Sequence, residues 1–264
     1  TTVSGGTAFL TNATAFTTPV ITNTTTYYVE ARNTTLGCLS VTRTPVTATV
    51  NPLPTMLNTS GASVCGSGSS TISATASAGS VIDWYTVSGG GIALQSGSTT
   101  FTTPVLSSST TYYAEARNSS TGCKSATRSA VTLTVNALPA ISNVSGASLC
   151  GTGSASINAG ASIGAAVDWY AASSGGSPLQ LASNVFNTPA LTVTTTYYAE
   201  ARDVTTGCIS ATRVPVTVTV LAKTSSTTNI TICNNQLPYE WNGNSYSSGG
   251  SYTLHFINSV GCDS

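Results

Sequence analysis

The sequence contains very little charge. Only 6% of its 264 residues are Asp, Glu, Lys or Arg, against about 25% in an ordinary soluble domain. Eight basic and eight acidic side chains cancel to a net charge of zero. A chain without a basic patch has nothing with which to neutralise phosphates, so the composition argues against nucleic acid as a partner.

Groups that perform acid–base or metal chemistry are equally scarce. The one histidine, His255, lies in an alternating strand-like pattern, and the serines have no neighbouring base to activate them. No Cys-x-x-Cys pair suggests zinc, and the Asp-x-Asp spacing of calcium sites is absent. The sequence therefore predicts no enzyme, no metal site and no cofactor.

Long apolar runs are missing as well. No stretch approaches the roughly 20 consecutive apolar residues that span a bilayer, so no membrane-spanning segment is expected in this chain. No signal peptide opens it. No window shows the 3.6-residue period of an amphipathic helix, which argues against an α-helical fold.

A repeat of 85 positions dominates what is present. The motif Thr-Tyr-Tyr-x-Glu-Ala-Arg occupies residues 26–32, 111–117 and 196–202, and a Gly-Cys pair follows each copy. Asp-Trp-Tyr at 83–85 returns at 168–170 with the same offset. We interpret residues 52–136 and 137–221 as complete modules. Residues 1–51 match the C-terminal portion of a module, and residues 222–264 begin a divergent repeat, so the chain is expected to be an excerpt.

Each module is expected to be a β-sandwich. Val131, Leu133 and Val135 alternate with Thr132 and Thr134, the period of two of a half-buried strand. Strands of this kind are separated by clusters of Gly, Ser, Asn and Pro. About seven short strands in 85 residues is typical of an immunoglobulin-like sandwich. Short proline-containing linkers favour an extended, semi-rigid rod of such modules.

The seven cysteines indicate disulfides and an oxidising compartment. Cys65 and Cys123 stand 58 residues apart, and so do Cys150 and Cys208. The equal spacing predicts one disulfide inside each complete module, and Cys233 is expected to pair with Cys262. Cys38 is left over, with its expected partner before residue 1.

Two groups of residues leave a functional alternative open. Glu115 and Arg117 share a strand face, and we expect a surface ion pair in which Asp83 or Glu115 lies near Arg117 or Arg128, rather than a glycosidase dyad. Trp84 and Trp169 lie in apolar strands and are predicted to be core residues. A third tryptophan, in Tyr-Glu-Trp-Asn-Gly at residues 239–243, precedes a turn and suits contact with a sugar.

The module resembles the Ig-like repeats of giant Bacteroidetes cell-surface proteins. Its Thr-Tyr-Tyr-x-Glu-Ala-Arg, Gly-Cys and Val-Thr-Val-Thr-Val elements carry the likeness, and residues 232–264 look like a second repeat type of the same proteins. Those families are similar to adhesins and gliding-motility surface filaments that leave the cell by type IX secretion. The resemblance implies a bacterial outer-surface location and a stalk, adhesive or self-assembling filament role.

Two functions follow as hypotheses. The first is a non-catalytic stalk or filament segment of a surface adhesin. The alternative is a set of carbohydrate-binding accessory modules of a secreted enzyme. Surface polysaccharide, another cell-surface target and further copies of the chain are the candidate partners.

Overall fold

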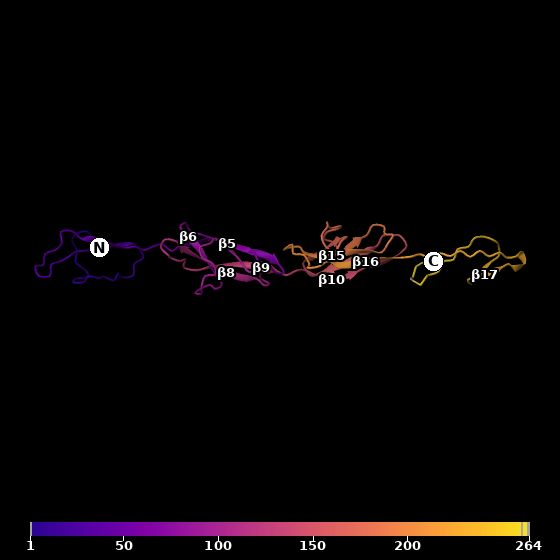
Figure 1. The fold of residues 1–264 in the computed structure, drawn as a ribbon, viewed down its shortest axis with the longest axis horizontal. Helices are drawn as coiled ribbons and strands as arrows, with labels where there is room; N and C mark the ends of the chain where they lie inside the picture. Colours follow the sequence, from indigo (N-terminus) through magenta and orange to yellow (C-terminus); the bar gives the residue numbers. More distant parts are fainter. Residues whose placement is uncertain (1, 260, 263–264) are drawn as a thin grey trace. The chain divides into compact units, whose positions relative to one another are not determined.

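The computed structural model describes residues 2–259, 261 and 262. Two compact units divide the chain, Thr1–Val135 and Asn136–Ser264. Apart from one 3₁₀ turn, η1 (Asn234–Gln236), the regular structure of the described residues consists of β-strands (Figure 1). The predicted all-β fold is confirmed.

In the first unit, β1 (Thr25–Val29) and β2 (Thr44–Ala48) form a two-stranded sheet. The second module, defined as the part that contains β3 to β9, has one sheet of three strands and one of four. The three-stranded sheet has the order β3 (Met56–Ser60), β5 (Thr71–Ala76), β7 (Thr100–Thr102). The four-stranded sheet has the order β4 (Ala62–Cys65), β9 (Ser129–Asn136), β8 (Thr110–Asn118), β6 (Ser80–Tyr85).

The second unit repeats this topology. The third module, defined as the part that contains β10 to β16, pairs β10 (Ile141–Ser145), β12 (Ser156–Ala161) and β14 (Val185–Asn187) in one sheet. The other sheet has the order β11 (Ala147–Cys150), β16 (Val214–Leu221), β15 (Thr195–Asp203), β13 (Ala165–Tyr170). The fourth segment, residues 222–264, adds the hairpin β17 (Tyr239–Trp241) and β18 (Asn244–Tyr246). Seven strands per module agree with the expected count.

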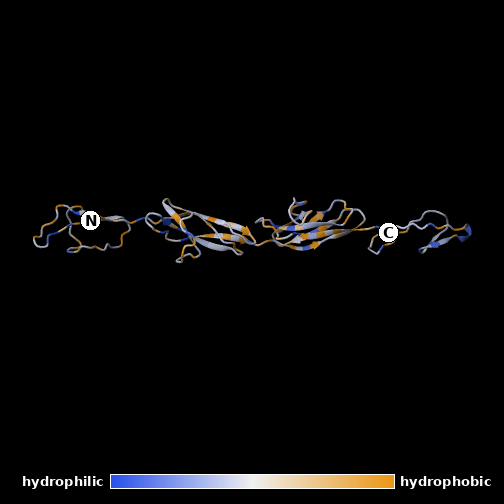
Figure 2. Ribbon diagram, viewed as in Figure 1, coloured by the Kyte–Doolittle hydropathy of each residue, from blue (hydrophilic) through white to orange (hydrophobic). Residues whose placement is uncertain are grey.

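Alternation of apolar and polar residues builds the core between the two sheets of each module. Figure 2 shows hydrophobic residues dispersed along the strands rather than gathered in one run. Trp84 is fully buried and stacks on Phe101 with ring centroids 5.9 Å apart. Its indole Nε1 donates a hydrogen bond of 2.9 Å to the Ser98 carbonyl, which satisfies the one polar atom of the side chain. Trp169 is likewise buried, as the sequence predicts, and its Nε1 atom donates to the Ser183 carbonyl at 2.9 Å.

The sheets β1–β2 and β8–β9 have the same sequence pattern but different burial. Val29 and Val46 are 57% and 53% exposed, whereas Ala114 and Val131, at the equivalent positions 85 residues later, are buried. In the second module those two residues pack against the facing three-stranded sheet. The strands β1 and β2 belong to a two-stranded sheet only. The alternation of apolar and polar residues therefore determines which face of a sheet is apolar. That face is buried only where a second sheet packs against it.

A glycine marks the place where the chain passes from one sheet to the other. Gly61 lies between β3 and β4, and a Cβ at this position would overlap the carbonyl oxygen of Thr132. Gly146 stands in the same relation to the carbonyl oxygen of Thr217 in the third module. Because the clashing atom in each case is a backbone carbonyl oxygen of the neighbouring strand, it cannot move away as the end of a flexible side chain could.

Replacing Gly61 with alanine is expected to lower the free energy of unfolding of the second module by about 1–3 kcal/mol, because the added methyl group forces strands apart. Denaturant titration followed by tryptophan fluorescence measures the loss. Gly89→Ala is the matched control, since a Cβ there meets no atom within 4 Å. Equal effects of the two substitutions would contradict the close approach.

The expected disulfide pairs are wrong. Cys150 is bonded to Cys262, with Cα atoms 5.3 Å apart, while Cys38, Cys123 and Cys233 are free thiols. Cys65 and Cys208 are each disulfide-bonded. Within the described residues, therefore, neither Cys65–Cys123 nor Cys150–Cys208 forms, and Cys233–Cys262 does not form either.

The strand register gives the physical reason. In the third module β11 runs parallel to β16, and Cys150 is in register with Leu221, the last residue of β16. Cys208 lies in the hairpin before Val214, where β16 begins. From Val214 to Leu221 the strand advances by seven residues, or about 23 Å. A disulfide needs Cα atoms within about 7 Å of each other. The two cysteines lie at opposite ends of one sandwich, so a spacing that recurs in each copy identifies equivalent positions but not partners.

Candidate functional site

Two carboxylates lie opposite each other on adjacent strands of the four-stranded sheet in each complete module. Asp83 of β6 is in register with Glu115 of β8, and Asp168 of β13 with Glu200 of β15. All four are nearly buried; Asp83 is 3% exposed and Glu115 is 8% exposed. A surface ion pair was expected, so the burial corrects that expectation. Each carboxylate must find its own partner inside the fold, because a buried unpaired charge is costly.

Asp83 is held by Arg117 in a two-point contact. The Arg117 Nε and Nη2 atoms donate to the two carboxylate oxygens at 2.6 and 3.1 Å, and the Gly97 amide donates to Oδ1 at 3.0 Å. Burial by itself would raise the pKa of Asp83, but the hydrogen bonds from Arg117 and Gly97 and the charge of Arg117 bring that pKa below its usual value. Asp83 is therefore an ionised structural group rather than a proton donor.

Glu115 takes three other partners. Arg128 Nε donates to Oε1 at 3.3 Å, while the Tyr85 hydroxyl and Lys124 Nζ lie 2.9 and 2.8 Å from Oε2. Burial would raise the pKa of Glu115, but hydrogen bonds from Lys124 and Tyr85 and the nearby charges lower it overall. The predicted proximity of acidic and basic groups is confirmed, with Asp83 paired to Arg117 and Glu115 to Arg128.

Arg128 also organises the loop that follows β6. Its guanidinium lies over the Tyr85 ring, 3.3 Å from the centroid, and its Nη1 atom donates to the carbonyls of Val87 and Gly90 at 2.8 and 2.7 Å. One side chain thus joins a carboxylate, an aromatic face and a loop. The sequence reasoning missed the tyrosine, although Tyr85 and Tyr170 recur with the 85-residue offset.

The third module reproduces this buried ion network. Arg202 binds Asp168 at 2.6 and 3.1 Å, and Arg213 Nε binds Glu200 at 3.1 Å while its guanidinium lies 3.3 Å from the Tyr170 centroid. Lys124 has no counterpart, because Ile209 occupies its place. Among the described side chains, no buried nitrogen or oxygen lacks a hydrogen-bond partner. Each carboxylate of the network is hydrogen-bonded to an arginine, which suits a structural role.

The ion network makes the second module acid-sensitive. The pKa values of Asp83 and Glu115 are lowered in the folded state, so their contribution is complete above the unfolded values of about 3.9 and 4.3 and is lost as the pH falls through the lower folded values. Calorimetry from pH 7 to pH 2 should show the transition of the second module shifting downward below about pH 4. An unchanged or rising transition temperature in that range would contradict the assignment.

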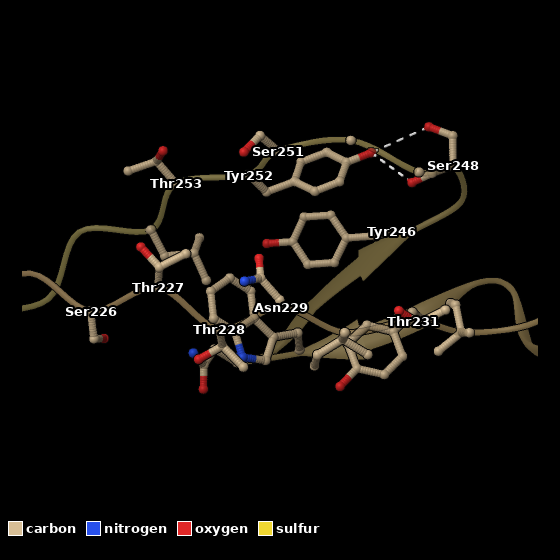
Figure 3. A pocket seen from close by; sticks show the side chains of 18 of the residues that line it. Ser226, Thr227, Thr228, Asn229, Thr231, Tyr246, Ser248, Ser251, Tyr252 and Thr253 are labelled. Atoms are coloured by element: carbon tan, nitrogen blue, oxygen red, sulfur yellow. Dashed lines mark hydrogen bonds between the residues drawn. The ribbon is translucent and has the colours of Figure 1, made fainter.

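A cavity of about 1420 Å³ lies in the fourth segment, lined by residues between Lys223 and Phe256 (Figure 3). Trp241 and Tyr246 of the β17–β18 hairpin have ring centroids 6.3 Å apart, and Tyr246 and Tyr252 have centroids 4.2 Å apart. The Tyr252 hydroxyl donates to the Ser248 carbonyl at 3.0 Å. Figure 3 shows the side chains of Asn229 and Tyr246 turned into the cavity. Aromatic rings, amides and hydroxyls line it, with few charges.

Turn chemistry positions the aromatic hairpin. Asn242 and Gly243 both have positive φ, 46° and 78°, which is the requirement of a two-residue hairpin turn whose twist matches its strands. The turn brings Trp241 beside the cavity, where the tryptophan is half-buried. The strand expected around His255 is absent; residues 252–256 lie in no strand, because no neighbouring strand in the described part of the chain pairs with them. His255 lines the cavity and is exposed.

Two further features are absent from residues 2–259, 261 and 262. No three His, Cys, Asp or Glu side chains in this part of the chain are grouped to hold a metal ion. The same residues contain no helix that is long and apolar enough to cross a membrane.

Comparison with known proteins gives a family and several structural likenesses. The family model described as "Ig-like domain CHU_C associated" matches residues 1–52, 53–136 and 137–221. No curated protein matches the chain.

Three solved structures illustrate the likeness. The titin domains I67–I69 (E-to-A variant) are 18% identical with a TM-score of 0.36, over 64% of this chain and 65% of that one. The Sidekick-1 immunoglobulin domains 1–4 are 16% identical with a TM-score of 0.33, over 77% and 60%. The fibronectin(III)-like modules of Clostridium thermocellum CbhA are 18% identical with a TM-score of 0.37, over 64% and 95%.

Proposed function

Because the chain belongs to the CHU_C-associated family of Ig-like domains, we propose that it is a non-catalytic stalk or filament segment of an extracellular cell-surface adhesin. Its modules would form a semi-rigid rod that holds a binding tip away from the surface of a bacterial cell. Export by the type IX route would deliver such a protein to that surface. The disulfides at Cys150–Cys262 and at Cys65 and Cys208 support an oxidising location.

The observation that carries this proposal is the kind of residue that repeats. The buried tryptophan, the buried ion network and the glycine at the sheet crossing recur in both complete modules. One exposed position varies: Lys124 corresponds to Leu39 in the first copy and to Ile209 in the third. A chain whose repeated side chains are interior and structural is suited to spacing rather than to recognition.

Stretching single molecules under reducing conditions tests the proposal. Each complete module should unfold as a separate event that releases about 300 Å of extended chain, since 85 residues extend by up to about 3.6 Å each. Labelling of intact producing cells with an impermeant reagent should also reach these modules. Unfolding of all modules in one cooperative step, or modification only after lysis, would contradict a surface rod.

The aromatic cavity of the fourth segment favours a second function, the binding of neutral polysaccharide. Sugars bind on aromatic faces and to hydrogen-bonding amides and hydroxyls, and Trp241, Tyr246 and Asn229 supply such groups. A glycan array probed with the chain should then give signals that Trp241→Ala abolishes and Trp84→Phe retains. An array without hits would remove this function and leave the stalk role untouched.

A further inference from the structure

The Gly-Cys pairs all lie in one kind of turn. The backbone NH of Asn118 donates to the Cys123 carbonyl at 2.8 Å and that of Gly122 to the Asn118 carbonyl at 2.9 Å. The turns at Cys38, Cys208 and Cys262 contain the same two bonds, from Asn33, Asp203 and Asn258 and from the glycine that precedes each cysteine. Each of these glycines has positive φ, between 72° and 84°. The fourth turn reaches its cysteine in one residue fewer.

The cysteines of these turns are in different covalent states. Cys208 is disulfide-bonded and Cys262 is bonded to Cys150. Cys38 and Cys123 are free thiols, the first exposed and the second half-buried. The same local structure therefore accepts a disulfide in two copies and presents an unused thiol in two others.

The partner of Cys262 occupies a defined place in its module. Cys150 ends β11, next to Leu221 at the end of β16, where the chain leaves the sandwich. Cys65 ends β4, the equivalent strand, and is disulfide-bonded too. Both of these strand-end cysteines are thus oxidised.

The turn also docks on the chain that leaves the sandwich. The Asn258 side chain donates from Nδ2 to the Ala222 carbonyl at 3.2 Å, and the Gly151 amide, next to Cys150, donates to the Leu221 carbonyl at 2.8 Å. Cys262 is fully buried at this contact. The disulfide therefore lies where the end of β11 contacts a Gly-Cys turn, and hydrogen bonds flank it on both sides.

We propose that the Gly-Cys turn is a receiving site for the strand-end cysteine of another module of this type. Cys38 and Cys123 are then cysteines whose inter-module disulfide has not formed. Their partner is the cysteine at the position equivalent to Cys150 in a second copy of the module. This proposal does not depend on the stalk function.

The chemistry is thiol oxidation with an external acceptor. The two thiols lose two protons and two electrons as the S–S bond forms, and glutathione disulfide, supplied as oxidant, is reduced to two glutathione molecules. Exchange proceeds through a mixed disulfide that the second thiolate resolves. No residue of the module other than the two cysteines changes its covalent state.

A two-component experiment tests the proposal. The donor chain carries Cys262→Ser, which releases Cys150, together with Cys38→Ser, Cys123→Ser and Cys233→Ser. The acceptor is the unaltered chain, whose free thiols are Cys38, Cys123 and Cys233. After incubation in a glutathione redox buffer, non-reducing electrophoresis should show a mixed dimer, and peptide mapping should identify the linked cysteines.

Cys233 is the matched control, because it is an exposed free thiol outside a Gly-Cys turn. Links from Cys150 to Cys123 or Cys38 should outnumber links to Cys233 by about tenfold, since docking raises the local concentration of the correct pair. Equal yields at the three cysteines, a dominant Cys150–Cys150 dimer or glutathione adducts alone would overturn the proposal. Tryptophan fluorescence of the donor chain verifies that its sandwiches remain folded.

Discussion

Replacing Trp84 with alanine lowers the free energy of unfolding of the second module by about 3–5 kcal/mol. The indole is fully buried, stacks on Phe101 and donates to the Ser98 carbonyl. Alanine leaves a cavity between the two sheets, which the surrounding structure fills only in part, and an unpaired Ser98 carbonyl. Calorimetry measures the loss as a lower transition temperature for the second module.

The third module is the internal control for this substitution. Its core contains Trp169 in the same environment, so its transition should stay in place when Trp84 is removed. Trp241→Ala is the second control, because that side chain is half-buried and lies in the β17–β18 hairpin. Comparable losses from Trp84→Ala and Trp241→Ala would show that burial between the sheets is not the source of the stability.

Arg213→Ala should destabilise the third module by about 3–5 kcal/mol, because Glu200 then remains buried without a cation. The substitution also removes the contact with the Tyr170 ring and the hydrogen bonds to the Ala172 and Gly175 carbonyls. Arg213 has only 9% of its side chain exposed, so solvent screens little of this loss. Calorimetry of the variant chain provides the measurement.

Arg128→Ala in the second module is the matched comparison. Glu115 keeps Lys124 at 2.8 Å in this variant, so the loss should be smaller than for Arg213→Ala. Adding Lys124→Ile, which copies Ile209 of the third module, should remove the difference. If Arg128→Ala and Arg213→Ala cost the same before that change, Lys124 contributes nothing to the buried network.

The buried network and the strand-end cysteines fit one mechanical interpretation. Arg128 ties β8 and the loop after β6 together within the second module, and the Cys150–Cys262 disulfide ties the third module to the segment that follows it. Contacts of the first kind resist unfolding of one sandwich, and contacts of the second kind limit rotation at a junction. Both kinds of contact are consistent with the proposed stalk function.

Much of the fold was predictable because its signals are local. Alternation in Val131, Thr132 and Leu133 indicates a strand with one buried face, and two of these residues are buried as expected. Asn242 and Gly243, the pair before β18, both have positive φ, which is the backbone conformation of a tight hairpin turn. Because the sequence repeats every 85 residues, a strand or turn predicted in one module is predicted at the equivalent position of the next.

The candidate sites were predictable only in part. The pairing of Asp83 with Arg117 follows from β6 lying beside β8, which the sequence suggests. The burial of Asp83 could not be read from the sequence, because it depends on the loop whose Gly97 amide covers it. The aromatic cavity likewise depends on residues 223–233 and 248–256, which lie in no strand even though the residues around His255 have a strand-like pattern.

The amino-acid sequence by itself determined the all-β class, the repeating module and the tryptophan at each core, since alternation and repetition are properties of neighbouring residues. The tertiary structure alone decided which cysteines meet. A disulfide needs Cα atoms within about 7 Å, and the parallel register of β11 with β16 carries Cys150 to the end of the third module opposite Cys208.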